Sequence, residues 1–451
     1  MRFFLSLQTV GHPFVLRHAP PLAVEVMART MGPSGKRPAG NADRLSDLPD
    51  GLIHYIMSFL TVREAVQTCM LSRRWEDLWC SMPFISIDEQ DFRPSAIGLG
   101  SEYLDDDYDD EFEDDIDYTR FEDFVTNLLM FHSAPTLDSF RFHAVCHAVS
   151  HREIKFINSW LCRCIKRCPK VVEIHSTGDC KLPRFGSGSS RLSRLHLTGI
   201  TLDRTFARQL PCSSYPVLED LELKRCKLDD DAEIASCTLK NLTIEDCTTS
   251  NPSALTIKAP SLTYLQLFIT AFGQNWHAVT VDEMPFLVKA TIRLKHSTAI
   301  LPCKLLYSLI YVRDLELTGL RTLDNLHIGS GTFPVFHNLR SLLLDKCDLS
   351  DNCDILGSFL NNAPCLEKLT LQLCELPEGS NKSKGGGNME KTSLEYQDTA
   401  SFQCPSLKWT EIKYRDDDDV QKLFNLILGV WRNLQKTGLV IKKASRSYSM
   451  L

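Results

Sequence analysis

The sequence predicts an α/β protein in which a small three-helix unit precedes a solenoid with a parallel β-sheet on its concave face. Two observations carry this prediction. An apolar-rich segment at residues 43–83 has helical spacing, and between residues 171 and 371 the pattern L-x-x-L-x-L returns every 21 to 27 residues. Such a period is typical of stacked repeats that bury their apolar edges against each other. At 451 residues the chain is also too long for one compact core.

Local signals divide the apolar-rich segment into three short helices. Pro49 suits the first helical position, where its missing N–H costs no hydrogen bond. The run Thr61-Val-Arg-Glu64 fits a capping box that starts a second helix. Ser72 can cap a third helix, whose tryptophans share one face. A unit of about 40 residues rarely folds alone, so this much apolar surface predicts one half of a protein–protein interface.

This segment resembles an F-box of the plant type. The resemblance rests on LSDLPD and IMSFL in the first half and on EAVQTCMLSRRWEDLW in the second, with Gly51 where the family usually has Glu. It implies the substrate-recognition subunit of an SCF-type E3 ubiquitin ligase, in which the F-box docks on a Skp-family adaptor and through it on cullin. The implied adaptor contacts, or direct supports of them, are Leu48, Pro49, Ile53, Ile56, Leu60, Leu71, Trp75 and Trp79.

The repeated pattern is that of leucine-rich repeats. Its clear copies are LSRLHL at 192, LEDLEL at 218, LKNLTI at 239, LTYLQL at 262, VRDLEL at 312, LRSLLL at 339 and LEKLTL at 366. A cysteine stands eight residues after the first Leu in four repeats, as Cys226, Cys247, Cys347 and Cys374. These thiols are expected to turn inward and pack between coils, so we discount them as metal ligands or nucleophiles.

The residues between the leucines are expected to face solvent on the concave side of the sheet. Tyr264 and Phe268 are aromatic there, and Lys289 and Arg293 add cations one repeat later. This combination is typical of the energetic centres of protein interfaces, and it predicts that these four residues bind a substrate protein. The alternative is that the loops or the C-terminal tail select the substrate.

The rest of the chain divides by composition. Residues 1–42 are expected to be a disordered extension, residues 84–119 an acidic linker, residues 120–378 the repeat solenoid and residues 379–400 a flexible insertion. Residues 102–118 contain eleven acids and no base, which predicts a solvated loop; the alternative is an acidic-aromatic docking strip. Residues 151–168 read as an amphipathic helix inside the repeat region.

Residues 401–443 resemble the FBD-type module that follows the repeats in many plant F-box proteins. The resemblance rests on Cys404-Pro-Ser-Leu-Lys408 and on a Leu-rich helix after Asp419, and residues 444–451 remain as a tail. The segment is expected to run as strand, acidic turn, helix and strand.

Composition excludes several other classes of function. The net charge of −7 excludes a field that would attract nucleic acid, and the apolar runs are too short to span a membrane. Seventeen scattered cysteines favour free thiols in a reducing compartment, hence the nucleus, the cytoplasm or both. The best metal candidates do not have zinc-site spacing; they are His143, Cys146, His147, His151, Cys162, Cys164 and Cys168. With no catalytic motif either, we expect no cofactor and a non-catalytic substrate adaptor.

Two other functions stay open. Some F-box proteins with leucine-rich repeats sense a small molecule in the solenoid, and a hydrophobic pocket ringed by Arg and Lys would favour that function here. Others are scaffolds that bind the adaptor without cullin. The sequence names neither the substrate nor the process.

Overall fold

The computed structural model describes residues 47–71, 73–92, 110–145, 151–177, 180–185, 190–203, 206, 210, 215–228, 232–249, 253–269, 276–294, 300–301, 303–323, 333–349, 354–375, 404–414 and 438–443. Several predictions fall outside these residues: the N-terminal extension, the cap at Ser72, the insertion at 379–400 and the Leu-rich helix after Asp419. The described residues belong to two compact units, 1–177 and 178–451.

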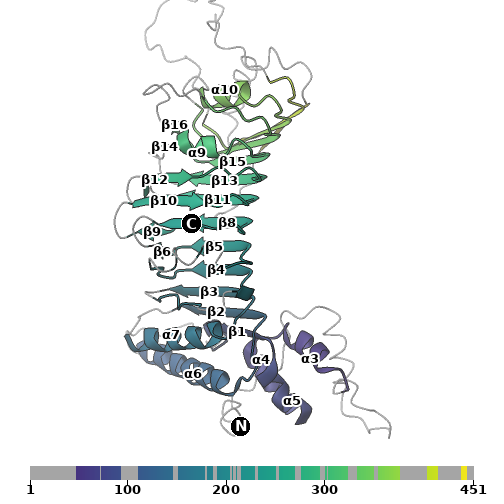
Figure 1. The fold of residues 1–451 in the computed structure, drawn as a ribbon, viewed down its shortest axis with the longest axis vertical. Helices are drawn as coiled ribbons and strands as arrows, with labels where there is room; N and C mark the ends of the chain where they lie inside the picture. Colours follow the sequence, from purple (N-terminus) through teal and green to yellow (C-terminus); the bar gives the residue numbers. More distant parts are fainter. Residues whose placement is uncertain are drawn as a thin grey trace, which may run out of the picture. The chain divides into compact units, whose positions relative to one another are not determined.

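The first unit combines short helices with a small parallel sheet (Figure 1). Its helices are α3 (Asp50–Met57), α4 (Val62–Gln67), α5 (Arg73–Leu78), α6 (Asp110–Phe131) and α7 (His151–Ile165), with the 3₁₀ turns η2 (Thr68–Met70), η3 (Trp79–Ser81) and η4 (Glu89–Phe92). Its strands β1 (Phe84–Asp88), β2 (Ser139–Val145) and β3 (Val171–Thr177) pair in parallel with β2 in the middle. Helix α7 confirms the amphipathic helix expected at 151–168.

Helices α6 and α7 lie side by side and cover the core of the first unit (Figure 1). Trp160 of α7 is buried, meets Phe121 of α6 edge-on with ring centroids 5.8 Å apart, and donates from Nε1 to Thr126 Oγ1 at 3.3 Å. Such aromatic pairs contribute about 1 kcal/mol beyond the area they bury.

The loop predicted over 102–118 is wrong for residues 110–118, which begin helix α6. The reason lies further along the helix. Phe121, Val125 and Leu128 are fully buried at helical spacing, so tertiary packing stabilises the helix. Strand β1 and turn η4 also lie within the segment predicted as a linker.

The second unit is a ladder of parallel strands (Figure 1). In order they are β4 (Arg194–Thr198), β5 (Asp220–Lys224), β8 (Asn241–Glu245), β11 (Tyr264–Ile269), β13 (Lys289–Leu294), β15 (Asp314–Thr318), β17 (Ser341–Asp345), β18 (Lys368–Gln372), β19 (Trp409–Tyr414) and β20 (Gly438–Lys443). Neighbours pair without shift, so the leucines of each repeat stack in buried rows, as Leu221, Leu242 and Leu265 show. This confirms the predicted leucine-rich-repeat solenoid.

Short return elements complete the repeats. They are the pair β6 (Lys227–Leu228) and β9 (Thr248–Thr249), the sheet β7 (Glu233–Ala235), β10 (Ser253–Lys258) and β12 (Trp276–Val281), the pair β14 (Ile300–Leu301) and β16 (Thr322–Leu323), and helices α9 (Cys303–Ser308) and α10 (Asp354–Asn361). Two of the final strands, β19 and β20, lie within the segment that resembles an FBD module.

Each repeat turns away from its strand in the same way. The residue after the strand has positive φ in six repeats, and these residues are Gly199, Arg225, Asp246, Gly319, Lys346 and Leu373. Its N–H donates to the last or last-but-one carbonyl of the next strand, for example Lys346 N to Gln372 O at 2.8 Å. At Gly319 a Cβ would lie 2.1 Å from Leu294 O, so this turn requires glycine.

The repeat cysteines follow directly after this turn. Cys226, Cys247 and Cys347 are buried, which confirms the predicted packing role, whereas Cys374 is half-buried. Each thiol faces a carbonyl of the preceding strand; Cys226 Sγ donates to Leu197 O at 3.4 Å. One cysteine departs from the expectation of free thiols, because Cys237 is disulfide-bonded.

Candidate functional site

The first candidate surface is built by α3, α4 and α5. The capping box at the start of α4 is confirmed: Thr61 Oγ1 accepts from Glu64 N at 3.2 Å, and Glu64 Oε2 accepts from Thr61 N at 3.0 Å. Pro49 is the N-cap of α3 with an extended ψ of 145°, one residue earlier than predicted. A hydrogen bond joins helix α3 to α5, between His54 Nε2 and Leu78 O, which lie 3.0 Å apart.

The residues predicted to serve adaptor binding divide into two groups. Ile53, Leu60, Trp75 and Trp79 are buried and form the core of the helical unit. Leu48 and Ile56 are half-buried, whereas Pro49 and Leu71 are exposed. The buried group can act only by holding the helices in place, so direct contact is open to the second group.

The sequence prediction missed three exposed apolar residues of the same unit, two on α3 and one in the turn η2. Leu52, Tyr55 and Met70 expose 51%, 63% and 58% of their surface. Leu52 and Tyr55 lie on one side of α3, opposite the buried Ile53 and Met57, and the Tyr55 ring meets Phe59 edge-on. We call Leu52, Tyr55, Met70 and Leu71 the apolar docking residues.

The signal for these residues was present in the sequence. The apolar residues of α3 cover more of the helix surface than packing against one neighbouring element would bury. One side of the helix can therefore face the core while the other faces outward. Which residues take which side depends on how α3 packs on α5, and this packing cannot be read from the pattern.

Hydrogen bonds and a cation–π contact join the helical unit, formed by α3, α4 and α5, to the rest of the first compact unit. Arg63 Nη1 donates to Asp91 O at 2.7 Å, and its guanidinium lies 5.3 Å from the centroid of the Phe92 ring. His132, at the end of α6, is buried and places Nε2 2.9 Å from Met82 O. Burial, with Arg167 beside the ring, lowers the pKa of His132 to about 4.

The second candidate surface is the open face of the repeat sheet, formed by the residues that alternate with the buried leucines. The register places Tyr264 beside Lys289 and Phe268 beside Arg293, so the structure brings the four predicted residues together. Tyr264 and Phe268 are half-buried, not fully exposed as predicted. Because Arg293 is exposed, it is the most accessible of the four.

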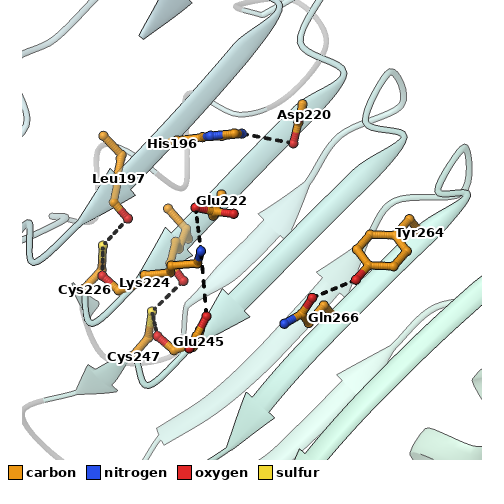
Figure 2. Close-up of polar contacts among 11 residues, drawn as sticks. His196, Leu197, Asp220, Glu222, Lys224, Cys226, Glu245, Cys247, Tyr264 and Gln266 are labelled. Atoms are coloured by element: carbon orange, nitrogen blue, oxygen red, sulfur yellow. Dashed lines mark hydrogen bonds and ion pairs between the residues drawn. The ribbon is translucent and has the colours of Figure 1, made fainter. Parts of the chain in front are cut away.

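Neighbouring groups restrain two of these residues. Tyr264 Oη donates to Gln266 Oε1 at 2.7 Å (Figure 2). Lys289 Nζ lies 2.9 Å from Glu316 Oε1, and this carboxylate raises the pKa of Lys289. The prediction of two available cations therefore reduces to Arg293, with Lys289 already engaged.

On strands β4, β5 and β8, which precede β11 in the sheet, most charged side chains form ion pairs within the chain. Asp220 lies 3.3 Å from His196 Nε2 (Figure 2). It also accepts from Arg194 at 3.1 Å, and the contacts with His196 and Arg194 lower the pKa of Asp220. Lys224 bridges Glu222 at 3.0 Å and Glu245 at 3.9 Å (Figure 2). The charges on this part of the face are therefore mostly paired within the chain, and a partner protein would have to replace these ion pairs in order to bind there.

A further exposed group adjoins β13 and was also missed. Phe286 exposes 65% of its surface and Val288 exposes 47%, just before Lys289. Arg313, exposed in the next repeat, donates its backbone N–H to Val288 O at 2.9 Å. The sequence Pro285-Phe-Leu-Val could have indicated this group. Leu287 points into the core, so the residues on either side of it in the chain point away from the core.

Of the discounted metal candidates, Cys146 and His147 lie outside the described residues, His143 lies on β2, and α7 carries His151, Cys162 and Cys164. His143 on β2 has Nδ1 3.0 Å from Asp88 Oδ1, and its ring meets that of His175 edge-on. Cys164 of α7 is buried, which raises its pKa to about 12, so its thiol is neutral. Within the described ranges, no group of three or more His, Cys, Asp or Glu residues could hold a metal ion. No helix in that part of the chain is long and apolar enough to cross a membrane.

Comparisons with known proteins agree with the geometry of the helical unit. Residues 45–86 match the F-box domain family. The chain is 32% identical over 412 residues to the meiotic F-box protein MOF of Oryza sativa subsp. japonica, covering 82% of this chain and 80% of that protein. It is 29% identical over 369 residues to a putative FBD-associated F-box protein of Arabidopsis thaliana, covering 73% and 75%. An F-box/FBD/LRR-repeat protein of the same plant is 29% identical over 235 residues, covering 50% and 49%.

Proposed function

Because this chain belongs to the plant F-box proteins with leucine-rich repeats and an FBD-type C-terminal module, we propose that it is the substrate-recognition subunit of an SCF-type E3 ubiquitin ligase. F-box proteins are generally non-catalytic adaptors. In this proposal the chain forms and breaks no bonds itself. It holds a target protein near the ubiquitin-charged enzyme and so raises the effective concentration of the target's lysines.

The apolar docking residues carry the adaptor-binding part of the proposal. Tyr55 and Met70 each expose more than half of their surface on a helical unit whose own core is already filled by Trp75 and Ile53. Large apolar side chains in such a position favour a partner protein. A Skp-family adaptor that links to cullin is the partner that F-box membership suggests.

The test is co-purification of the full chain with a plant Skp-family adaptor and cullin. Leu52→Ser combined with Tyr55→Ser should weaken adaptor binding at least about tenfold, since each large anchor contributes roughly 1.5–3 kcal/mol when buried. Leu48→Ala with Pro49→Ala should also weaken it about tenfold or more. The matched control is Met130→Ser on α6, which removes a side chain of similar exposure, 57%, outside the F-box.

Two outcomes would contradict the proposal. Wild-type adaptor affinity in both double variants would show that the adaptor does not use this surface. An adaptor complex that never retains cullin would instead indicate a cullin-independent scaffold.

We also propose that the middle of the open face contacts the target protein. The supporting observation is that Tyr264, Phe268 and Arg293 lie on neighbouring strands, with Phe286 and Val288 exposed at the adjoining edge. Aromatic and arginine side chains are enriched among the residues that dominate binding energy.

The variant that tests this surface reverses charge at Lys289 and Arg293 and places Ala at Tyr264 and Phe268. It should lose the target protein that co-purifies when the proteasome is blocked, with adaptor binding intact. Lys289→Glu would also repel Glu316, so Phe268→Ala with Arg293→Glu is a milder second variant. A target still bound to both variants would place recognition in the loops or the C-terminal tail.

We propose residence in the nucleus, the cytoplasm or both, on the basis of the many scattered cysteines. A fluorescent fusion found in the secretory pathway would contradict this.

A further inference from the structure

The last three strands of the repeat sheet present an exposed tryptophan. In register, Lys368 of β18, Trp409 of β19 and Gly438 of β20 lie side by side on the open face. Trp409 exposes 45% of its surface, although an indole of this size is usually buried. An exposed Trp on a rigid strand is a common anchor in protein interfaces.

Gly438 determines where the indole lies. A Cβ on Gly438 would come within 2.9 Å of Cε3 and 3.1 Å of Cζ3 of Trp409. The six-membered ring therefore lies directly against the backbone of β20, in space that any other residue would occupy. This contact restrains the ring on one side, so less side-chain entropy remains to be lost on binding.

Cations outnumber carboxylates on β18, β19 and β20 and on the residues that precede these strands. Glu367 is shared by Arg340 at 2.6 Å and Lys408 at 3.3 Å. Glu411 lies 3.1 Å from Lys442, and the nearby Lys413 and Lys368 also act to lower its pKa. The cations of this group are Arg340, Lys368, Lys408, Lys413 and Lys442. Asp345 of β17 also interacts with Lys413, so five cations and three carboxylates leave a surplus of two positive charges on a chain whose net charge is −7.

We propose that this Trp409 surface, defined as Trp409 and the five cations, binds an acidic segment of a partner protein that carries a large apolar side chain. The apolar side chain would lie on the indole, and the acidic side chains would pair with the surplus cations. This goes beyond the proposed function, because it does not depend on adaptor binding or on the middle of the open face.

A protein segment fits this surface better than a nucleic acid does. Glu367 and Glu411 stand among the cations and would repel a continuous phosphate backbone. Separate carboxylates on a peptide can avoid these two positions. The rim charges should mainly affect the association rate and its salt dependence, whereas Trp409 should affect the lifetime of the complex.

The test measures direct binding to the full-length chain by fluorescence anisotropy at low and high salt. The probe is a short labelled peptide of Glu and Asp around one Leu-Phe pair. A second peptide carries Lys in place of each acid, and a short single-stranded RNA represents the other class of ligand. The acidic peptide should bind tightest, and its affinity should fall as salt rises.

Two variants and one control separate the contribution of the indole to peptide binding from that of the cations. Trp409→Ala should weaken binding about tenfold, in the range of interface anchors. Lys368→Gln with Lys408→Gln should weaken it about fivefold at low salt and reduce its salt dependence. The control is Lys240→Gln, which removes a lysine paired to Glu219 at 2.7 Å elsewhere on the same unit and should change affinity less than about twofold.

Each contrary result overturns the proposal. These results are an acidic peptide bound no tighter than its lysine counterpart, RNA bound tighter than the acidic peptide, or wild-type affinity in Trp409→Ala. If Trp409→Ala fails to fold, the test rests on the double variant Lys368→Gln with Lys408→Gln. Wild-type affinity in that double variant would then count against the proposal.

Discussion

The helical unit and the open face of the repeat sheet differ in how far their exposed side chains are satisfied within the chain. On α3 two large apolar side chains, Leu52 and Tyr55, are exposed, and hydrogen bonds within the chain cannot satisfy their apolar surface. On β5 the outward side chains are charged and already paired, as Lys224 is with Glu222 and with Glu245 of β8. An apolar surface favours a lasting partner, whereas a paired polar surface is stable alone and gives specificity when a partner matches it.

The largest effect should come from the core of the helical unit. Trp75 is fully buried, so Trp75→Ala should cost about 3–5 kcal/mol of the free energy of unfolding. Denaturant unfolding should show an early transition for the first unit and a late, unchanged transition for the second. A single unchanged transition would mean that the helical unit does not depend on this side chain.

The next effect concerns pH. The pKa of His132 is lowered to about 4, below its ordinary 6.5. The unfolded chain therefore binds a proton before the folded chain does, and stability is complete above about pH 6.5 and is lost as pH falls toward 4. The loss should reach about 3 kcal/mol, and His132→Gln should remove this pH dependence. An equal slope in the variant would assign the effect to other groups.

The turns of the repeats should respond more weakly. Gly319→Ala places a Cβ 2.1 Å from Leu294 O at a φ of +72° and should cost about 1–3 kcal/mol. Lys346→Gly is the matched control, because Lys346 has a φ of 50° at the same position of its turn; it should be neutral or stabilise by up to about 1 kcal/mol. Thermal unfolding of both variants measures the difference, and equal effects would contradict the conformational explanation.

The smallest effect should come from a surface ion pair. Arg194→Gln removes one of two partners of Asp220 and should cost at most about 0.5 kcal/mol, less at high salt. A loss several times larger would show that the open face contributes to stability as strongly as the helical core.

The sequence alone determined the repeat, the strand positions and the capping box at Thr61. These follow from local rules, because alternation along a strand and spacing along a helix need no knowledge of distant residues. It also determined that Tyr264, Phe268, Lys289 and Arg293 would come together, since parallel repeats of similar length stack in register.

Only the tertiary structure decided which apolar residues of α3 face outward and that α6 extends back to Asp110. Likewise, only packing places the Trp409 indole on Gly438 and pairs Lys289 with Glu316. The physical reason is common to these cases. Whether a side chain is buried, paired or exposed depends on neighbours far away in the sequence, and these neighbours are fixed only once the chain has folded.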